Sequence, residues 1–503
     1  MQKTALLSVS DKTGIVEFAQ FLQTKNYRIT STGGTYKHLK DNGIQVIEVS
    51  NITNFPEILD GRVKTLHPNI HGGILARRSN SSDMQTLADK NISTIDMVVV
   101  NLYPFFENAD KELELSELAE FIDIGGPTML RAAAKSFFDV IVITDINDYD
   151  KIRQEIENQN DTSLETRKYL AAKVFNLTSA YDAAIAQSLS NEKFMPYYTI
   201  SYKKKMDLRY GENPHQSAAF YENTIASGAL KNFTQIQGKD LSFNNIRDLD
   251  IAWKVVSEFD ETACCAVKHS TPCGVALDEN LAKAYQKAYD CDPISIFGGI
   301  VAFNKKLDKA AAKKCNEIFL EIVVAPDFDN EALEILSEKK NLRVIKAAHL
   351  PQDKIQLVQV DGGLLVQDSD WDFSRNFQTV TEKSVSESQK EDLIFALKVI
   401  KHVKSNAIVV AKNRQALGVG TGETNRIWAA KQAIERAMEK ETEGLVLASD
   451  AFFPFRDVVD FAAEKGITAI IQPGGSMRDK ESIDAANEHN IPMIFSGMRH
   501  FLH

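Results

Sequence analysis

The chain has 503 residues, of which 44% are hydrophobic and 25% are charged, which is typical of a soluble globular protein. At about 150 residues per domain, this length predicts roughly three domains. The formal charge of -11 disfavours nucleic-acid binding, because a phosphate backbone repels an acidic protein. The sequence shows neither a membrane span nor an export segment, so we expect a cytoplasmic protein.

The N-terminal 190 or so residues alternate short apolar runs with amphipathic segments. We predict strands at residues 4–9, 27–31, 45–49, 97–101 and 140–144, and a helix that buries Ile15, Phe18, Ala19 and Leu22. Such alternation is typical of a parallel sheet with helices on both faces. In that architecture ligands bind at the carboxyl ends of the strands.

Two polar motifs follow predicted strands directly. Residues 8–14 (SVSDKTG) and residues 31–35 (STGGT) both open a helix. Their hydroxyls, Lys12 and free backbone N–H groups suit a phosphate, although ordinary helix caps have the same composition.

Residues 61–78 form a cationic segment without an acid. The segment holds Arg62, Lys64, Arg77 and Arg78 together with two histidines. In an acidic chain this predicts a pocket for a small phosphorylated ligand, the alternative being a solvated basic loop. His67 and His71 are left out of the predicted ligand contacts, because a histidine next to Pro68 more plausibly satisfies backbone groups.

Residues 123–135 (DIGGPTMLRAAAK) predict a helix with Pro127 in its first turn. Asp123 offers a carboxylate, Gly125 and Gly126 offer oxyanion donors, and Lys135 offers an ammonium group. The alternative is a capped surface helix with an exposed lysine.

Together with residues 101–105 (NLYPF), these motifs resemble the inosine monophosphate cyclohydrolase half of the family of bifunctional purine-biosynthesis proteins that also carry AICAR transformylase. The resemblance extends from about residue 4 to residue 190. It implies a methylglyoxal-synthase-like fold and closure of formyl-AICAR to inosine monophosphate with loss of water. It also implies that Lys64, Tyr103, Asp123 and Lys135 are catalytic, with Lys135 and Asp123 at the reacting groups.

The same resemblance assigns the phosphate and ribose contacts, and three further substrate contacts. The first set is Ser10, Lys12, Thr13, Gly14, Thr32, Gly33, Gly34, Thr35, Arg62 and Thr65, and the second is Asn101, Gly125 and Gly126.

A boundary is predicted near residue 200. Residues 191–205 lack periodicity and end in three lysines, which indicates a solvated linker. Beyond it, two successive sets of strands and helices suggest two similar units in tandem. We therefore predict domains at residues 1–198 and 199–503, the second built from units at about 199–367 and 390–503.

Five motifs in this second part resemble the AICAR transformylase half of the same family. They are residues 207–216 (DLRYGENPHQ), 267–274 (VKHSTPCG), 295–299 (SIFGG), 450–457 (DAFFPFRD) and 498–503 (MRHFLH). The resemblance implies two tandem cytidine-deaminase-like units, although the zinc motif of deaminases is absent and no metal is expected. The five cysteines, all between residues 264 and 315, are expected to be reduced.

Formyl transfer from 10-formyltetrahydrofolate to the weakly nucleophilic amine of AICAR needs a base and an oxyanion donor. We expect His269 to act as the base, Lys268 to stabilise the oxyanion or protonate the leaving nitrogen, and Asn406 to donate to the formyl oxygen. Lys268 and His269 share a site only if their strand ends or bends there, which Pro272 and Gly274 favour.

The resemblance also implies the remaining contacts and the assembly. AICAR contacts are assigned to Arg209, Tyr210, Phe297, Gly298, Glu321, Arg499, Phe501 and His503. Folate contacts are assigned to Phe453, Pro454, Phe455 and Asp457, for which ordinary core is the alternative. Glu321 stands where the family often has Asp. A homodimer with transformylase sites between subunits is expected, without nucleic acid or membrane.

One rival function is a non-catalytic nucleotide sensor, because methylglyoxal-synthase-like domains also serve as allosteric modules. It explains the phosphate motifs but gives no role to Tyr103, Asp123 and Lys135 together.

Overall fold

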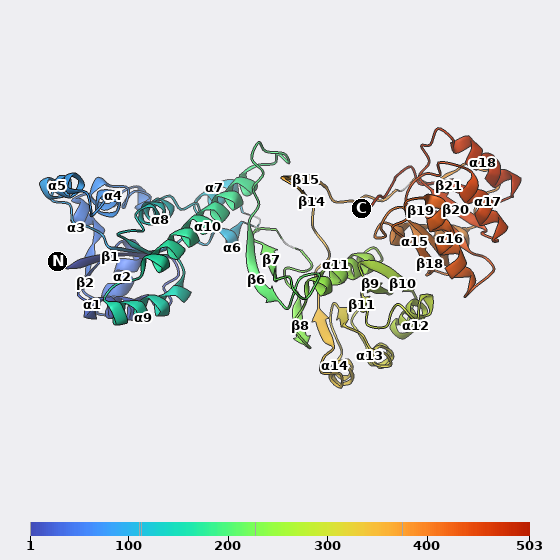
Figure 1. Ribbon diagram of the computed structural model, residues 1–503, viewed down its shortest axis with the longest axis horizontal. Coiled ribbons are helices and arrows are strands. Elements are labelled where there is room, and N and C mark those ends of the chain that lie inside the picture. Colours follow the sequence, from blue (N-terminus) through green and yellow to red (C-terminus); the bar gives the residue numbers. More distant parts are fainter. Residues whose placement is uncertain (1, 110, 112, 227, 375) are drawn as a thin grey trace. The chain divides into compact units, whose positions relative to one another are not determined.

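The structure is a computed structural model that describes residues 2–109, 111, 113–226, 228–374 and 376–503. The chain forms two compact units (Figure 1). Unit 1 contains Met1–Lys203 and Asn223–Ala226, and unit 2 contains Lys204–Glu222 and Ser227–His503. Within the described ranges, the helices are all too short or too polar to cross a bilayer.

Unit 1 is built on a five-stranded sheet whose pairs are all parallel, in the order β3-β2-β1-β4-β5. Its strands are β1 (Lys3–Val9), β2 (Tyr27–Ser31), β3 (Val46–Glu48), β4 (Met97–Asn101) and β5 (Ile141–Ile143). Its helices are α1 (Ile15–Thr24), α2 (Gly33–Asp41), α3 (Val49–Thr53), α4 (Pro68–Leu75), α5 (Ser81–Asp89), α6 (Phe105–Asn108), α7 (Leu115–Ala119), α8 (Gly125–Lys135), α9 (Tyr149–Gln159) and α10 (Leu164–Leu189). The parallel sheet predicted from the sequence is confirmed.

The helices of unit 1 cover both faces of this sheet. On one face α1 and α9 pack together, with the rings of Phe18 and Tyr149 stacked at 4.5 Å. Figure 1 shows α8 and α10 on the opposite face. Because all five strands run in one direction, their carboxyl ends lie at one edge, where the loops into α1 and α2 begin.

Unit 2 is built on a twelve-stranded mixed sheet with the order β16-β21-β20-β19-β17-β18-β10-β9-β11-β12-β13-β8. Its strands are β8 (Thr234–Gln237), β9 (Ala263–Lys268), β10 (Thr271–Leu277), β11 (Ile300–Phe303), β12 (Ile322–Ala325), β13 (Arg343–Lys346), β16 (Gln378–Thr379), β17 (Ile408–Lys412), β18 (Gln415–Gly420), β19 (Val446–Ser449), β20 (Ala469–Gln472) and β21 (Met493–Phe495). Two hairpins, β6 (Tyr202–Leu208) with β7 (Ala218–Asn223) and β14 (Ile355–Val360) with β15 (Gly363–Asp368), form separate small sheets.

The twelve strands form two halves of the same topology. From the junction of β10 and β18 outward, each half has an antiparallel hairpin, three parallel strands and an antiparallel edge strand. The helices of the first half are α11 (Phe243–Ser257), α12 (Leu281–Cys291), α13 (Lys309–Asn316) and α14 (Asn330–Ser337). Those of the second half are α15 (Glu387–Ile400), α16 (Arg426–Met438), α17 (Asp457–Glu464) and α18 (Asp479–Glu488).

The two halves share one core. Residues of α11 and α15 form a single buried cluster over the sheet, which includes the contact between Phe259 and Phe395. The other helices of each half cover the sheet in two separate clusters.

The predicted solvated linker is wrong at its C-terminal end. Lys203, Lys204 and Lys205 lie within β6. The ammonium group of Lys205 pairs with Glu222 at 3.2 Å and lies 4.7 Å from the centre of the Phe233 ring. The lysines lie in a strand because alternate side chains point to opposite faces, which lets Lys205 pack inward.

Candidate active sites

The N-terminus of α2 brings together two of the predicted lysines. A Cβ atom added to Gly33 would lie 3.1 Å from the Lys64 ammonium nitrogen, and one added to Gly34 would lie 3.9 Å from the Lys12 ammonium nitrogen. Thr32, the N-cap residue, makes no capping hydrogen bond through its side chain. The first amides of a helix have no intrahelical partner, so with these ammonium groups they can bind an anion such as phosphate.

Asp123 lies close enough to Lys64 for the lysine charge to act on its carboxyl. Its Oδ1 accepts a hydrogen bond from Gly126 N at 2.9 Å, and a Cβ atom added to Gly125 would lie 3.0 Å from Thr65 Oγ1. Burial raises the pKa of the Asp123 carboxyl, against the opposing effects of the Gly126 N–H and the Lys64 charge. A raised pKa brings this group closer to the range in which it can exchange a proton. Tyr103 contributes through its backbone N–H, and its side chain is 43% exposed.

We refer to Lys12, Gly33, Gly34, Lys64, Thr65, Tyr103, Asp123, Gly125 and Gly126 as the unit 1 site.

Two residues expected to touch the ligand brace the loops instead. Asn101 Oδ1 accepts from the N–H groups of Ser10 and Asp11, and Asn101 Nδ2 donates to Asp11 O at 2.9 Å. The Thr35 hydroxyl is buried and binds both N and O of Val9, at 3.0 and 2.9 Å. The side chain of Thr35 is therefore committed to the end of β1 rather than to a ligand.

Some hydrogen-bonding groups of the loop that precedes α1 bind one another. Thr13 donates to Asp11 through both its N–H and its hydroxyl, and these bonds lower the pKa of Asp11. Gly14 has φ +69°, a conformation that glycine adopts without strain. Three N–H groups expected to be free, those of Ser10, Asp11 and Thr13, are thus already bound.

Lys135 lies at the opposite end of α8 from Asp123. Lys135 is the last residue of α8 and Gly125 is the first. At about 1.5 Å per residue, the two are separated by roughly 15 Å along the helix axis. The Lys135 side chain is exposed.

The arginines of the cationic segment 61–78 all bind other groups of the protein. Arg62 pairs with Glu120 at the surface, and Arg77 forms a two-point ion pair with Asp83. The Arg78 guanidinium donates to three backbone carbonyls. His67 Nδ1 accepts from Asn69 N at the start of α4, so its predicted role in satisfying backbone groups is confirmed.

In unit 2, Lys268 ends β9 and a tight turn follows. His269 and Ser270 have φ values of +53° and +59°, as in the two-residue turns that join hairpin strands. The Asp248 carboxylate accepts from His269 N at 3.2 Å and from Ser270 N at 2.7 Å. The strand therefore ends at Lys268, which is the condition for the predicted placement of Lys268 and His269 in one site. Residues 268–271 are called the Lys268 turn.

The second half of the sheet holds an equivalent turn. Lys412 ends β17, the next two residues also have positive φ, and the Asp392 carboxylate accepts from both of their N–H groups. Lys412 pairs with Glu441 at 2.8 Å, whereas Lys268 donates to the Phe297 carbonyl oxygen at 2.6 Å. Of the two equivalent lysines, only Lys412 thus pairs with a carboxylate among the described residues.

Some of the residues predicted to contact AICAR already bind other groups of the protein. The Phe297 ring is 57% exposed, and Gly298, with φ +71°, donates to Phe319 O. Glu321 is bound through one oxygen to buried Arg343, which leaves its other oxygen for a hydroxyl group. The Arg209 guanidinium lies 5.4 Å from the centre of the Tyr210 ring.

Asn406 belongs to a second cluster in unit 2, the Asn406 cluster. Its Oδ1 accepts from Arg426 at 2.6 Å, and its Nδ2 donates to Glu423 O at 2.8 Å. Arg426 also forms a buried ion pair with Asp450. The side-chain amide is thereby held with one N–H still available, as its expected role as a donor requires.

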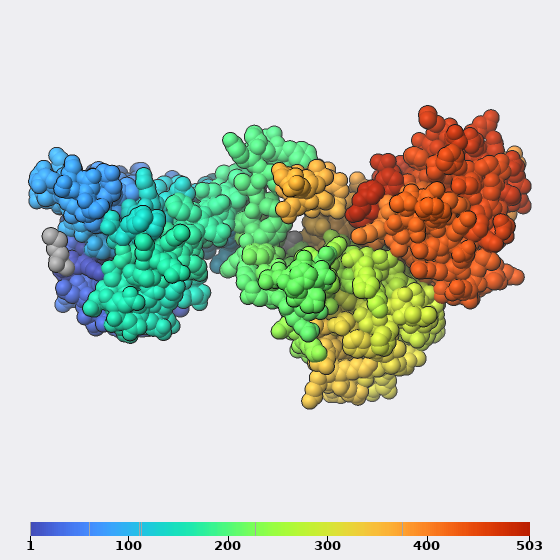
Figure 2. Space-filling model, viewed as in Figure 1, coloured from blue at the N-terminus to red at the C-terminus, as the bar shows by residue number. Residues whose placement is uncertain are grey.

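The C-terminal residues pair with the same cluster. Ser405 N donates to Leu502 O at 2.8 Å, and Leu502 N donates to Ser405 Oγ at 3.1 Å. His500 is buried and its ring pairs with Asp370 at 2.7 Å. Among the predicted tail residues, the Arg499 guanidinium lies over the Phe501 ring, which in turn contacts the ring of His503. Figure 2 shows the tail at the surface of unit 2.

Phe453 is completely buried, as the alternative of ordinary core predicts. It belongs to the cluster under α16 and α17, because its side chain points into the core that these helices cover. Phe455 is 51% exposed and lies beneath the Arg478 guanidinium. Pro454 is half-buried, and Asp457 is exposed at the start of α17.

Sequence reasoning missed the residues that hold these groups in place. Asp248 fixes the Lys268 turn, and Arg426 and Asp450 fix Asn406. All three lie far from their partners in sequence, so spacing carried no signal for them. Within the described ranges, no group of three or more His, Cys, Asp or Glu residues is placed to hold a metal ion.

Comparisons with known proteins agree with this architecture. The model of the AICARFT/IMPCHase bienzyme family matches residues 133–436, and that of the MGS-like domain matches residues 14–128. The chain is 61% identical to the "Bifunctional purine biosynthesis protein PurH" of Fusobacterium nucleatum, and 59% and 60% identical to the proteins of that name from Clostridium botulinum (strain Kyoto / Type A2) and Clostridium perfringens (strain 13 / Type A). Each comparison covers 100% of this chain and 100% of the relative.

A solved structure described as "Crystal structure of ForH" is 37% identical, over 38% of this chain and 100% of that chain, with a TM-score of 0.35.

An MGS-like domain at residues 14–128 and a bienzyme family match at residues 133–436 define the class of protein as a bifunctional enzyme. The chain belongs to the AICARFT/IMPCHase bienzyme family.

Proposed function

We propose that the two activities of this family reside at separate sites, ring closure at the unit 1 site and formyl transfer in unit 2. The chain is a bifunctional enzyme of purine biosynthesis, an AICAR formyltransferase that uses 10-formyltetrahydrofolate and an inosine monophosphate cyclohydrolase. The observation that carries the division is that each unit holds its own polar groups with a lysine among them. These lie around Lys64 and Asp123 in unit 1, and at the Lys268 turn and the Asn406 cluster in unit 2.

In the transfer step, the AICAR amine attacks the formyl carbon of the folate. A carbon–nitrogen bond forms, the bond from the formyl carbon to folate N10 breaks, and N10 takes up a proton. His269 removes the amine proton, Lys268 stabilises the oxyanion or protonates N10, and the free N–H of Asn406 donates to the formyl oxygen. Arg426 orients Asn406 for this donation.

In the closure step, the carboxamide nitrogen of formyl-AICAR attacks the formyl carbon and water leaves. Asp123 exchanges the proton, for which its raised pKa is suited. Lys64 and Tyr103 assist the oxyanion, and Lys12, Gly33 and Gly34 hold the phosphate at the α2 N-terminus. Lys135 keeps its proposed catalytic role, at the far end of α8 from Asp123.

The remaining parts of the proposal concern architecture and assembly. The two halves of unit 2 are cytidine-deaminase-like units, a reading supported by their identical strand order. The enzyme is a cytoplasmic homodimer with transformylase sites between its subunits.

The experiment is an assay of the purified chain with AICAR and 10-formyltetrahydrofolate, followed by detection of inosine monophosphate. Formation of this product supports the assignment. A folded sample that binds AICAR but forms neither formyl-AICAR nor inosine monophosphate contradicts it.

A further inference from the structure

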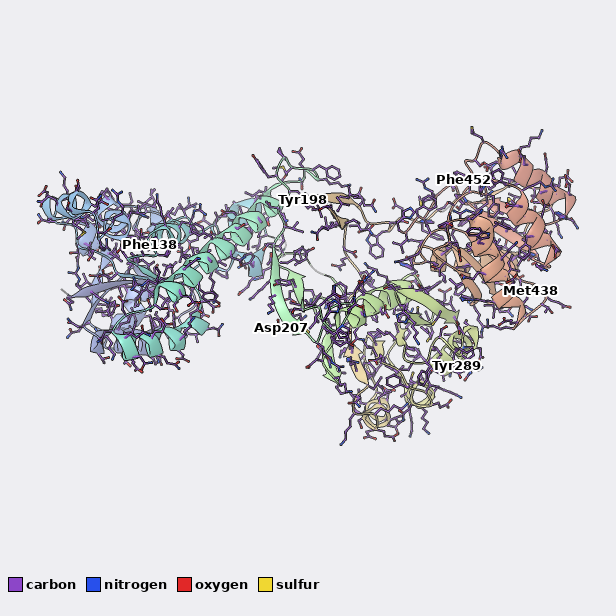
Figure 3. The ribbon with its side chains drawn as sticks, in the orientation of Figure 1. Phe138, Tyr198, Asp207, Tyr289, Met438 and Phe452 are labelled. Carbon is purple, nitrogen blue, oxygen red and sulfur yellow. The ribbon has the colours of Figure 1, made fainter. Side chains whose placement is uncertain are left out.

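A cavity of about 200 Å³ lies in unit 2 between the two equivalent hairpins. The strands β10 and β18 pair through the single residue pair Ala276 and Gln415, and beyond it their bulged segments line the cavity. The helices α12 and α16 flank it; Figure 3 labels Tyr289 on the first and Met438 on the second.

The wall of this cavity is cationic. It carries Lys268, Arg436 and Lys440 against one carboxylate, that of Asp292, with His269 beside them. In a chain with a formal charge of -11, such an excess of positive groups marks a place that favours an anion.

The three cations bind only carbonyl oxygens among the described residues. Arg436 donates to Val419 O at 3.3 Å, and Lys440 donates to Leu417 O at 3.1 Å and Arg436 O at 2.7 Å. Lys268 donates to Phe297 O. An ammonium group has three N–H donors and a guanidinium has five, so each retains donors for a ligand.

The equivalent lysine in the other half of the sheet, Lys412, has a carboxylate partner. There the charge of Lys412 is neutralised by Glu441 at 2.8 Å. At Lys268 the corresponding charge is left to the cavity, next to the proposed base His269.

The cavity is smaller than the roughly 300 Å³ or more of sites that enclose a whole small molecule. Its volume is several times the roughly 30 Å³ that one water molecule occupies, which suffices for a phosphate or a terminal carboxylate group.

We propose that this cavity is a subsite for the anionic terminus of a formyl-transfer substrate, held by Arg436 and Lys440 while the reacting end lies at His269. The inference rests on the proposed function of the Lys268 turn. Two substrate groups have this chemistry, the phosphate of AICAR and the glutamyl carboxylates of the folate.

The test is a pair of double-mutant cycles on the full-length enzyme. The variant is Arg436→Gln with Lys440→Gln, and the matched control is Lys431→Gln, an exposed lysine on the same helix. Calorimetry gives dissociation constants for AICAR against its nucleoside without phosphate, and for tetrahydrofolate against tetrahydropteroate without glutamate. These ligands do not react, so binding is measured apart from chemistry.

We expect one of the two anions to strengthen binding at least about tenfold in the wild type and the Lys431→Gln control, and less than about twofold in the double variant. If the substitutions remove the gain from the phosphate, the cavity holds the phosphate of AICAR. If they remove the gain from the glutamate, it holds the carboxylates of the folate. Arg436→Lys, which keeps the charge, retains most of the gain.

The proposed subsite is wrong if, in both cycles, the effect of the substitutions and the effect of removing the anionic group from the ligand are additive to within about twofold. An unchanged far-ultraviolet circular dichroism spectrum and an unchanged urea unfolding midpoint of the double variant show that unit 2 is folded. Because the cycles measure binding alone, they remain informative even where wild-type enzyme fails to transfer a formyl group, the outcome that sinks the proposed function instead.

Discussion

Lys268 and Lys412 occupy equivalent positions but have different partners, and this offers a direct test of function at the level of single residues. We expect Lys268→Ala to lower formyl transfer by about 100-fold or more, since it removes the cation nearest the proposed base. Lys412→Ala deletes the same atoms at the other turn, where Glu441 already neutralises the charge. It should change transfer less than about twofold.

Steady-state transfer assays on both variants check this expectation, with ring closure of supplied formyl-AICAR as the measure of intact unit 1. Equal losses in the two variants would show that the turns are structural.

Asp123 links catalysis to stability. We expect Asp123→Asn to lower ring closure by about 100-fold or more, because the amide cannot exchange the proton, while transfer is unchanged. Asn keeps an oxygen that can accept from Gly126 N.

The same substitution has a pH-dependent effect on unfolding. Burial raises the pKa of Asp123 in the folded chain, so its protonated form is favoured there more than in the unfolded chain. Its contribution to stability is therefore present below the unfolded pKa and lost as pH rises through the folded pKa. Urea titrations from about pH 4 to about pH 8 should show Asp123→Asn gaining stability relative to wild type as pH rises. A constant difference across this range contradicts the raised pKa.

At the scale of elements, the C-terminal tail is short but holds several predicted contacts. Its backbone pairs with Ser405, next to Asn406. We expect deletion of residues 499–503 to abolish formyl transfer and leave ring closure within about twofold, since the unit 1 site lies wholly in the other part of the chain. Transfer and closure assays on the truncated enzyme check this. Retained transfer would remove Arg499, Phe501 and His503 from the site.

The end of α11 is joined to the end of α15 by a buried ion cluster. The Glu258 carboxylate lies 3.0 Å from Lys401 and 3.0 Å from the His402 ring, and all three side chains are nearly buried. Burial tends to raise the pKa of Glu258, but His402 and Lys401 outweigh it and the pKa is lowered. Its stabilising effect is therefore present above the unfolded pKa and lost as pH falls through the folded one.

We expect Glu258→Gln to cost about 3 kcal/mol of unfolding free energy near neutral pH, because it leaves the Lys401 charge buried and unpaired. Denaturant titrations should show this cost shrinking in acid. Glu261→Gln, an exposed neighbour, is the control and should cost less than about 0.5 kcal/mol. Equal costs for the two variants would show that the buried cluster does not hold the helices together.

The elements differ in how well they could be predicted. The parallel strands of unit 1 were predicted to within a residue or two, because each is a continuous apolar run between polar loops. The strands β10 and β18 are harder to predict, since a two-residue turn joins each to the preceding strand and leaves no break in the pattern. The lysines of β6 were misread because a strand can carry charge on one face.

For the molecule as a whole, the motifs predict which residues belong to the candidate sites but not how their side chains are arranged. Lys64, Asp123 and Gly125 were predicted together and lie together. Thr35 and Phe453 were assigned to ligands although their side chains are buried, because a motif reports residue type and not the direction in which a side chain points. The place of Lys135 relative to Gly125 could not be seen in the motif, because the length of α8 separates groups that are close in sequence.

The central claim is that one chain carries two independent sites that act in sequence. It is tested most directly by mixing Lys268→Ala enzyme with Asp123→Asn enzyme and supplying AICAR and 10-formyltetrahydrofolate. Each variant alone should form almost no inosine monophosphate, since one lacks transfer and the other lacks closure. Together they should form it, because formyl-AICAR made by Asp123→Asn enzyme is closed by Lys268→Ala enzyme. A mixture as inactive as either variant, with both proteins folded, would contradict the account.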